Sequence, residues 1–193
     1  MGVTAANVLM GPGTIYQATF GTTFPADSAA TIAAGAPAGF ADTGGTHGGI
    51  TMMIDQTMQD LDVDQVPDPI GTRLTARKVQ LQVELAEVTL NNLGLVLNGL
   101  LTIGVQPSYT TAGLQTTVAA FQPTYVSLIF DGFAPTLGTG APARRRMNAY
   151  KCASTAKIQE KHNKKDQRTF AATFTCYYVS PSQPPVYWID QTA

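Results

Sequence analysis

Charged residues are scarce in this chain of 193 residues, of which only 13% are Asp, Glu, Lys or Arg. That share is about half of what a soluble globular domain usually carries. Hydrophobic residues make up 44% of the chain, and glycine alone contributes 18 residues. Because charge cannot cover the surface of such a subunit, we expect neighbouring protein to cover much of it. The length suits one well-buried core, so a single domain spanning 1–193 is predicted.

Basic residues are missing from the amino-terminal third of the chain, where Arg73 is the first Lys or Arg. A secretory signal begins with a basic region, so we predict that the protein is not exported by that route. The longest apolar run, 93–105, is interrupted by glycine and asparagine and is too short to span a bilayer. No membrane span is therefore expected.

Catalytic signatures are missing as well. The two histidines, His47 and His162, lie in a glycine-rich and a lysine-rich segment, with no nucleophile or metal-ligand spacing beside them. No Gly-x-Ser-x-Gly elbow, phosphate-binding glycine loop or Cys-x-x-Cys pair occurs in the sequence. We therefore predict that the protein is not an enzyme and uses no cofactor.

Four aspartates two to four residues apart offer the hard oxygen ligands that calcium prefers, namely Asp60, Asp62, Asp64 and Asp68. The calcium-binding loop requires Gly at its sixth position and Glu at its twelfth, where this chain has Gln65 and Gly71. Strand alternation explains the spacing better, with the aspartates on a wet face and Leu61 and Val63 on the other. No metal site is assigned.

Cysteine is nearly absent, since Cys152 and Cys176 are the only two. Facing each other on adjacent strands, they would form either a disulfide or two buried thiols. Because a protein that is not exported stays in a reducing compartment, two buried thiols are the favoured alternative.

The residues that are present favour strands. Apolar and polar side chains alternate from Val79 to Ala86, which predicts a strand with one buried face. Two shorter strands are predicted upstream, one at 50–55, where Met53 breaks the alternation, and one around Leu61 and Val63.

Two further strand regions follow downstream. The run 125–130 is rich in aromatic and β-branched residues and is predicted to end at the turn signal Asp131-Gly132. A late hairpin is predicted in which Cys152 faces Cys176 and the polar turn is 162–166; a register shifted by two residues remains an alternative. In the first register, Tyr150 faces Tyr178, Ile158 faces Phe170 and Lys161 faces Gln167, and one buried face holds Phe170, Ala172, Phe174, Cys176 and Tyr178.

One helix is predicted at 90–98, with Thr89 as its amino-terminal cap, Gly99 beyond its end, and a stripe formed by Leu90, Leu93 and Leu97. A helix this short must pack on the sheet to be stable. The Gly- and Ala-rich segment 24–49 is predicted as a long loop and 180–193 as an extended carboxyl-terminal arm whose apolar side chains dock somewhere.

Opposite charges are segregated along the chain. Residues 55–68 contain five aspartates and no Lys or Arg, whereas nine of the twelve basic residues lie in 144–168. The favoured interpretation is head-to-tail self-association into rings or filaments; nucleic-acid binding and two ordinary solvated faces are the alternatives. The candidate subunit contacts are Arg144, Arg145, Arg146, Lys164, Lys165, Tyr187 and Trp188.

Three features occur in a fixed order along the chain. They are a glycine-rich loop at 40–50, a strand that leads into a helix at 83–93, and the late hairpin with its Lys164-Lys165-Asp166 turn. Their layout resembles that of the major tail tube proteins of long-tailed, siphovirus-type bacteriophages. The resemblance covers most of 35–179 as a pattern of elements, and no single motif in it is as specific as a catalytic signature.

The resemblance implies a mainly β fold, an antiparallel β-sandwich or barrel flanked by one short helix. It implies hexameric rings that stack into a tube around a tape-measure protein, with tail terminator and baseplate proteins at the ends. The tube would be assembled in the host cytoplasm, remain in the virion tail, and conduct DNA without binding it specifically. Segments 24–49 and 180–193 are then the candidates for joining successive rings.

A channel for DNA should repel phosphate, so the candidate lumen-facing residues are acidic, namely Asp60, Asp62, Asp64 and Glu84. Two other classes of function remain as alternatives. One is a carbohydrate- or protein-binding β-sandwich module, and the other is a small enzyme of unrecognised type.

Overall fold

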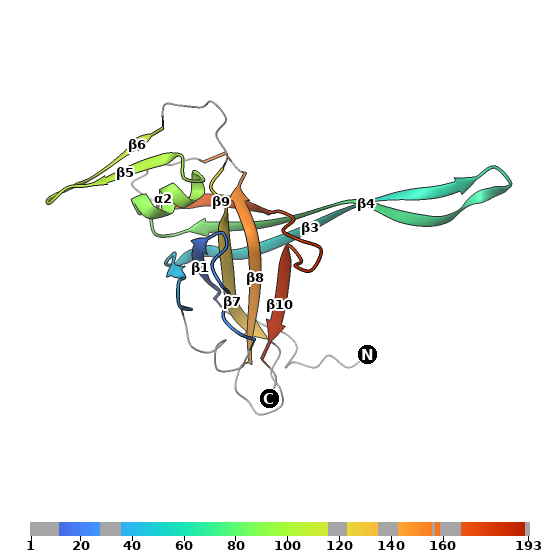
Figure 1. The fold of residues 1–193 in the computed structure, drawn as a ribbon, viewed down its shortest axis with the longest axis horizontal. Helices are drawn as coiled ribbons and strands as arrows, with labels where there is room; N and C mark the ends of the chain where they lie inside the picture. Colours follow the sequence, from blue (N-terminus) through green and yellow to red (C-terminus); the bar gives the residue numbers. More distant parts are fainter. Residues whose placement is uncertain are drawn as a thin grey trace.

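The computed structural model describes residues 12–27, 36–115, 123–134, 143–155, 157–158 and 167–191. Its body is a strongly curved β-sheet, and two hairpins project from opposite ends of this body (Figure 1). The elements are β1 Thr14–Thr19, β2 Ala41–Asp42, β3 Thr46–Val63, β4 Val66–Leu85, α2 Leu90–Val96, β5 Leu101–Val105, β6 Thr110–Leu114, β7 Val126–Ala134, β8 Ala143–Ser154, β9 Phe170–Cys176 and β10 Val186–Asp190.

All the strand pairs described are antiparallel, and α2 is the one helix in the described ranges. The predicted fold class, mainly antiparallel β with a single short helix, is thus confirmed. The main sheet has the order β2-β1-β7-β8-β9-β4-β3, and β5 and β6 form a separate two-stranded sheet.

The main sheet divides at β8. One edge of β8 pairs with β7, while the other edge pairs with β10 over 145–149 and with β9 over 152–154. Beyond this point β3 and β4 cross above β7, β8 and β10, as Figure 1 shows. The two parts of the sheet therefore enclose a shared core between them.

The core is built by strand alternation. Val79, Leu81, Val83 and Leu85 of β4 are all at most 5% exposed, which confirms the predicted buried face of this strand. They pack in one cluster with side chains from the other main strands, including Ile15, Leu128, Phe130, Ala149, Phe170 and Phe174. Each large apolar side chain buried in this way stabilises the fold by about 1.5–3 kcal/mol.

The opposite face of the sheet is covered by the chain's own glycine- and alanine-rich segment. The Phe24 ring lies 5.1 Å from Phe40 and 4.6 Å from Tyr150, between ring centroids. Phe40 also packs with Tyr16 and Ile129 in a second buried cluster. The described parts of 24–49, which include β2 and the start of β3, therefore pack on the sheet of the same chain.

The helix α2 lies close to its predicted position but ends two residues earlier, and it buries a different face. Thr89 caps it by accepting a hydrogen bond of 3.1 Å from the Asn92 backbone N–H. Asn92, Leu95 and Val96 are the buried residues, and Leu93 of the predicted stripe packs against the core, whereas Leu90 is 37% exposed, so the prediction was wrong at Leu90. The Asn92 amide explains the difference, because it donates to the backbone carbonyls of Thr43 and Glu87, both at 2.8 Å.

The carboxyl-terminal end of the helix is fixed by Asn98 and Gly99. Asn98 has a positive φ of 53°. Its side-chain Nδ2 donates a hydrogen bond of 2.7 Å to the Ser154 carbonyl, and its Oδ1 accepts one of 2.6 Å from the Ser154 N–H. Gly99 has a φ of +74°, and a Cβ there would lie 2.5 Å from the Thr124 hydroxyl. This junction ties the helix to the end of β8.

Two strand boundaries differ from prediction. The segments predicted as separate strands at 50–55 and around Leu61 and Val63 belong to one strand, β3, which turns into β4 at Asp64-Gln65. The predicted turn at Asp131-Gly132 was also wrong, because β7 continues through Ala134. Asp131 can lie in the interior because a residue of opposite charge faces it on β8, so the strand need not end there.

The late hairpin has the predicted register where β8 and β9 pair, but the predicted pairs of Tyr150 with Tyr178 and of Ile158 with Phe170 are not part of this ladder. Cys152 faces Cys176 and Ser154 faces Phe174, and Thr155 adds a backbone hydrogen bond of 2.8 Å to Thr173. Tyr178 was wrongly placed on the buried face, since β9 ends at Cys176 and Tyr178 is 66% exposed. The predicted turn 162–166 and Lys161 lie outside the described residues.

Candidate assembly surfaces

The most unusual feature is the outer part of the β3–β4 hairpin, residues 55–78, which we name the arm. Strand β9 pairs with β4 only over Val79–Leu85, so among the described strands the arm pairs with nothing but itself. At about 3.3 Å per residue it extends roughly 40 Å from the body (Figure 1). A two-stranded hairpin on its own is marginally stable in water, so the arm would gain stability from a surface that covers it.

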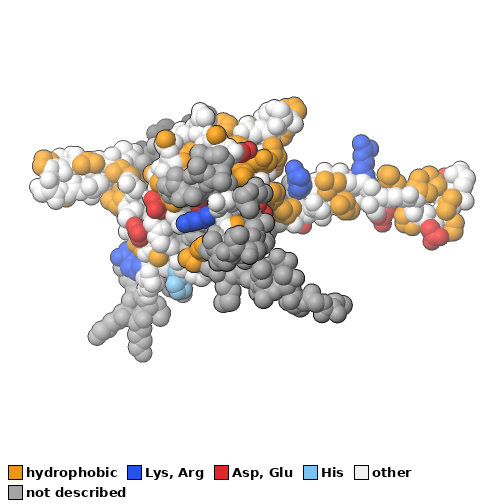
Figure 2. Space-filling view, turned by 90° about the horizontal axis from the view of Figure 1, so that it is seen from below, with side chains coloured by type: hydrophobic (Ala, Val, Ile, Leu, Met, Phe, Trp, Pro, Cys, Tyr) orange, Lys and Arg blue, Asp and Glu red, His pale blue; other side chains and the backbone are white. Residues whose placement is uncertain are grey.

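An apolar stripe runs from the core onto the arm. Across the ladder Met52 faces Leu81 and Ile54 faces Val79, so each pair shares one face of the ribbon. The β4 members are buried, whereas Met52 and Ile54 are 37% and 43% exposed. Farther out Met58 faces Leu74 on the same face, and these are 54% and 46% exposed. We name Met52, Ile54, Met58 and Leu74 the arm stripe; Figure 2 shows apolar side chains along the whole arm.

The four acidic residues predicted to face a lumen do not form one site. Asp60 lies on the outer half of the arm, opposite Thr72, and Asp62 and Asp64 follow it toward the turn. Glu84 lies at the base of the hairpin, opposite His47, whose Nδ1 is 3.1 Å from the Glu84 Oε2. Twelve residues of β4 separate Thr72 from Glu84, which is about 40 Å along the strand.

Glu84 belongs to a broad polar surface on the other side of the core strands. A hollow there is lined by residues of β3, β4 and β9 with few charges among them, including His47, Thr51, Gln82, Glu84, Ala171 and Thr173. This surface is the outward face of the sheet, because the alternate residues of β4 are buried in the core.

Arg146, predicted as a subunit contact, is buried inside the protein, so that prediction was wrong. It lies directly opposite Asp131 on β7, and its Nε donates a hydrogen bond of 3.1 Å to Oδ1 of that carboxylate. Both side chains are at most 1% exposed. The strand alternation of β8 places Arg146 and Asn148 on the face opposite Met147 and Ala149, and both are at most 1% exposed.

Burial raises the pKa of the Asp131 carboxyl, even though its hydrogen bond with Arg146 and the Arg146 charge act in the opposite direction. The second oxygen of Asp131, Oδ2, and the Asn148 Oδ1 have no hydrogen-bond partner among the described residues. Burial, with the Asp131 charge as the second cause, also raises the pKa of Tyr16. This polar cluster is therefore a costly interior feature that depends on its ion pair.

The other predicted basic contacts are at the surface but engaged within the chain. Arg145 makes two hydrogen bonds of 2.6 Å to the Asp190 carboxylate on β10, and the bond to Arg145 lowers the pKa of Asp190. The guanidinium of Arg144 lies 5.7 Å from the centroid of the Phe133 ring. Lys164 and Lys165 lie outside the described residues.

The segment predicted as a carboxyl-terminal arm docks on its own sheet through β10. Tyr187 faces Asn148 and Trp188 faces Met147 across the β8 ladder, so the two aromatic side chains lie on opposite faces. Tyr187 is 40% exposed and its hydroxyl donates to the Asp27 carboxylate at 3.3 Å. Trp188 is 44% exposed on the side of the core.

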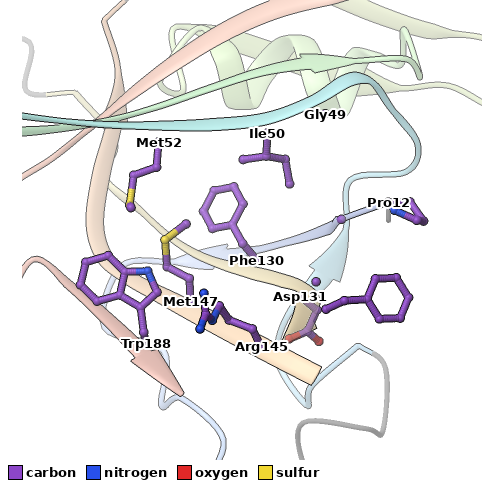
Figure 3. A pocket seen from close by; sticks show the side chains of 12 residues that line it. Pro12, Gly49, Ile50, Met52, Phe130, Asp131, Arg145, Met147 and Trp188 are labelled. Carbon is purple, nitrogen blue, oxygen red and sulfur yellow. The ribbon is translucent and has the colours of Figure 1, made fainter. Parts of the chain in front are cut away.

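Trp188 lines a hollow of about 240 Å³ where the sheet divides (Figure 3). Ile50 and Met52 of β3 close it from one side and Phe130, Met147 and Trp188 from the other, with Arg145 at its rim. The hollow is the open end of the core. Since Met52 belongs to both, the hollow and the arm stripe form one continuous apolar surface.

A second projecting ribbon, the β5–β6 hairpin, was missed by the sequence reasoning. Its odd-numbered β5 residues share a face with Leu114, and on that face Ile103, Val105 and Leu114 are 36%, 78% and 66% exposed. The opposite face carries only Thr102, Gly104, Thr111 and Gly113. The signal that could have revealed it is the absence of any charged residue from 88 to 130.

The remaining candidate groups are structural. Cys152 and Cys176 are buried free thiols with their Sγ atoms 3.4 Å apart, and the hydrogen bond between them and burial raise the pKa of Cys152. Within the described ranges, no group of three His, Cys, Asp or Glu side chains is placed to hold a metal ion. None of the helices described there is long and apolar enough to cross a membrane.

Comparison with known proteins does not identify the chain by descent. No protein-family model matches it. No curated protein sequence is detectably similar to it either. Its function must therefore be argued from the surfaces described above.

Proposed function

We propose that this protein is a non-catalytic structural subunit of a phage tail tube, which self-assembles into rings, six-membered by resemblance, that stack around a DNA-conducting channel. The observation that carries the proposal is the arm, a long ribbon whose apolar stripe continues the core into solvent. In a permanent monomer this ribbon would be marginally stable and would leave its apolar side chains in water, so its presence favours a partner that covers it.

Open sheet edges give further support. Strand β3 pairs with β4 along one edge, and its other edge has no partner among the described strands. Exposed edges invite pairing with another chain, and closing a ring of subunits into one barrel removes them. The layout resemblance to tail tube proteins supplies the specific assembly; tape-measure, tail terminator and baseplate proteins would be the partners, and the virion tail the location.

For the channel surface we propose the polar face around Glu84, because its threonine and glutamine side chains offer DNA few charges to bind. The placement of Asp60, Asp62 and Asp64 on the lumen stays a prediction. Replacing Glu84 with Lys should leave tube formation intact but slow DNA ejection, since a ring of ammonium groups would attract phosphate. Ejection at the wild-type rate would count against this channel surface.

The test of the proposed function is negative-stain electron microscopy of the purified protein across a concentration series, with size-exclusion chromatography in parallel. Rings or hollow tubes of uniform width are expected. A variant in which Asn-Gly replaces 58–75 and joins Thr57 to Ala76 keeps every pair between β4 and β9. It should remain folded and monomeric.

A wild-type protein that stays monomeric at every concentration, and that binds glycans or another protein in solution, would contradict the tube. The carbohydrate- or protein-binding module would then be the better description. Assembly of the arm-deleted variant into the same tubes would show instead that the arm is not what joins the subunits.

A further inference from the structure

We infer that the β5–β6 hairpin of one copy packs against the arm stripe of the next copy, so that subunits join head to tail. This inference rests on the proposed self-assembly and names the two surfaces that perform it. The hairpin and the arm project from opposite ends of the body (Figure 1), and both ends are visible again in the perpendicular view (Figure 2). Neighbours in a row can therefore overlap their projections without turning over.

The two ribbons have matching chemistry. The hairpin presents Ile103, Val105 and Leu114 on one face, and the arm presents its stripe on one face. Two sheets packed face to face at about 10 Å bury such faces against each other. The small side chains on the other face of the hairpin would remain outward, as the exposed side of a sandwich requires.

Burying the hairpin costs little, because no charged group has to leave water. Residues 88–130 contain none, so the whole hairpin and the helix it rests on are uncharged. On the arm, Arg77, which is opposite Gln56, and Asp60, which is two residues beyond Met58 on β3, share the face of the stripe. The long apolar stem of Arg77 can lie along Ile54 and Met58 while its guanidinium reaches solvent at the rim. The packed hairpin must end short of Asp60, so that this carboxylate stays in water.

The aspartates of the outer arm argue against the simplest alternative, in which the arms of two copies pack on each other. That arrangement would bring together two copies of the outer arm, each with Asp60, Asp62, Asp64 and Asp68 and without a basic residue in 55–72. Like charges at close range oppose association. The uncharged hairpin is the cover that meets no such repulsion.

The apolar surface available to the hairpin is larger than the stripe alone. Met52 links the stripe to the hollow lined by Met147 and Trp188, which lies on the same side of β3. The tip of the hairpin carries Tyr109, which is 64% exposed. Aromatic side chains of this kind are typical anchors at the centre of protein interfaces.

The test uses two variants that each disable one surface, Met58→Asp on the arm and Val105→Asp on the hairpin. Each should need at least about tenfold more protein to assemble, because a carboxylate would have to be buried in an apolar interface. The matched controls put the same carboxylate on the opposite faces, Gln59→Asp and Thr102→Asp, and should assemble like the wild type. Circular dichroism should show all four folded, since none of these side chains is in the core.

The decisive measurement is analytical ultracentrifugation of the two disabled variants mixed in equal amounts. The intact hairpin of Met58→Asp can bind the intact arm of Val105→Asp, after which no matching surfaces remain. At a protein concentration where neither variant assembles alone, the mixture should therefore form dimers and nothing larger. An arm-to-arm contact predicts instead that Val105→Asp assembles normally by itself and that Met58→Asp stays monomeric in the mixture.

The outcomes separate this inference from the proposed function. Tubes formed by both the wild type and Val105→Asp would overturn the inference and leave the tube function standing. Dimers in the mixture, together with open fibres and no channel for the wild type, would support the inference and contradict the tube. A wild-type protein that is monomeric at all concentrations would overturn both.

Discussion

At the scale of single residues, the most demanding interior feature is the buried pair of Asp131 and Arg146. A charge in the interior is tolerated because its partner is directly opposite on the next strand. This pairing could not be predicted from the sequence, because Arg144, Arg145 and Arg146 are consecutive and resemble a single basic surface patch. Alternation along β8 gives them different environments, and the facing aspartate comes from a segment that reads locally as a turn.

Replacing Asp131 with Asn should lower the free energy of unfolding by about 3–5 kcal/mol, because it leaves the Arg146 charge buried without its carboxylate. The measurement is urea denaturation followed by circular dichroism. Asp190→Asn is the matched control, since it breaks an ion pair whose side chains are 44% and 43% exposed. It should cost about 1 kcal/mol or less. Equal effects of the two substitutions would contradict the assignment of the buried pair.

The pH dependence of these two carboxyls should have opposite signs. The pKa of Asp131 is raised in the folded protein, so the folded state holds the proton more tightly, and stability falls as pH rises from its unfolded to its folded pKa. The pKa of Asp190 is lowered, so its contribution is present above its unfolded pKa and is lost as pH falls through its folded pKa. Titration of the carboxyl carbons by NMR measures both directions, and a lowered pKa for Asp131 would mean that its bond to Arg146 outweighs its burial.

At the scale of elements, the strands with one buried face could be predicted and those with two exposed faces could not. The alternation in 79–85 and the facing cysteines located β4 and β9 because the core imposes a period of two on them. Residues 55–63 lack that constraint, since both faces of the arm lie in solvent, and the single strand β3 was therefore predicted as two short strands. The β5–β6 hairpin escaped notice for the same reason.

The junction at Asn98 is the element-scale feature most open to a direct test. Asn98→Ala removes both hydrogen bonds to the Ser154 backbone and places a less tolerant residue at a positive φ. We expect a loss of about 2–3 kcal/mol in the free energy of unfolding. Asn91→Ala, on the exposed side of α2, should change it by about 0.5 kcal/mol at most. A loss no larger than that of the control would mean that α2 is not anchored here.

At the scale of the whole molecule, two forces compete to explain how copies join. Segregated charges along the chain suggested acidic surfaces meeting basic ones, but three described basic groups already have partners within the chain. Arg146 is paired in the interior, Arg145 with Asp190, and Lys151 Nζ lies 4.3 Å from the centroid of the Tyr125 ring. The arm stripe and the apolar face of the β5–β6 hairpin remain exposed.

Salt decides between the two forces. Contacts between charged surfaces weaken as ionic strength rises, because the screening length falls from about 10 Å at 0.1 M to about 3 Å at 1 M. Apolar contacts do not weaken, and sulfate strengthens them. We therefore expect the protein concentration needed for assembly to stay constant or rise little in sodium chloride and to fall in ammonium sulfate, as measured by light scattering. Disassembly between 0.1 M and 1 M sodium chloride would instead assign the joining of subunits to the aspartates of the arm and a basic surface that receives them.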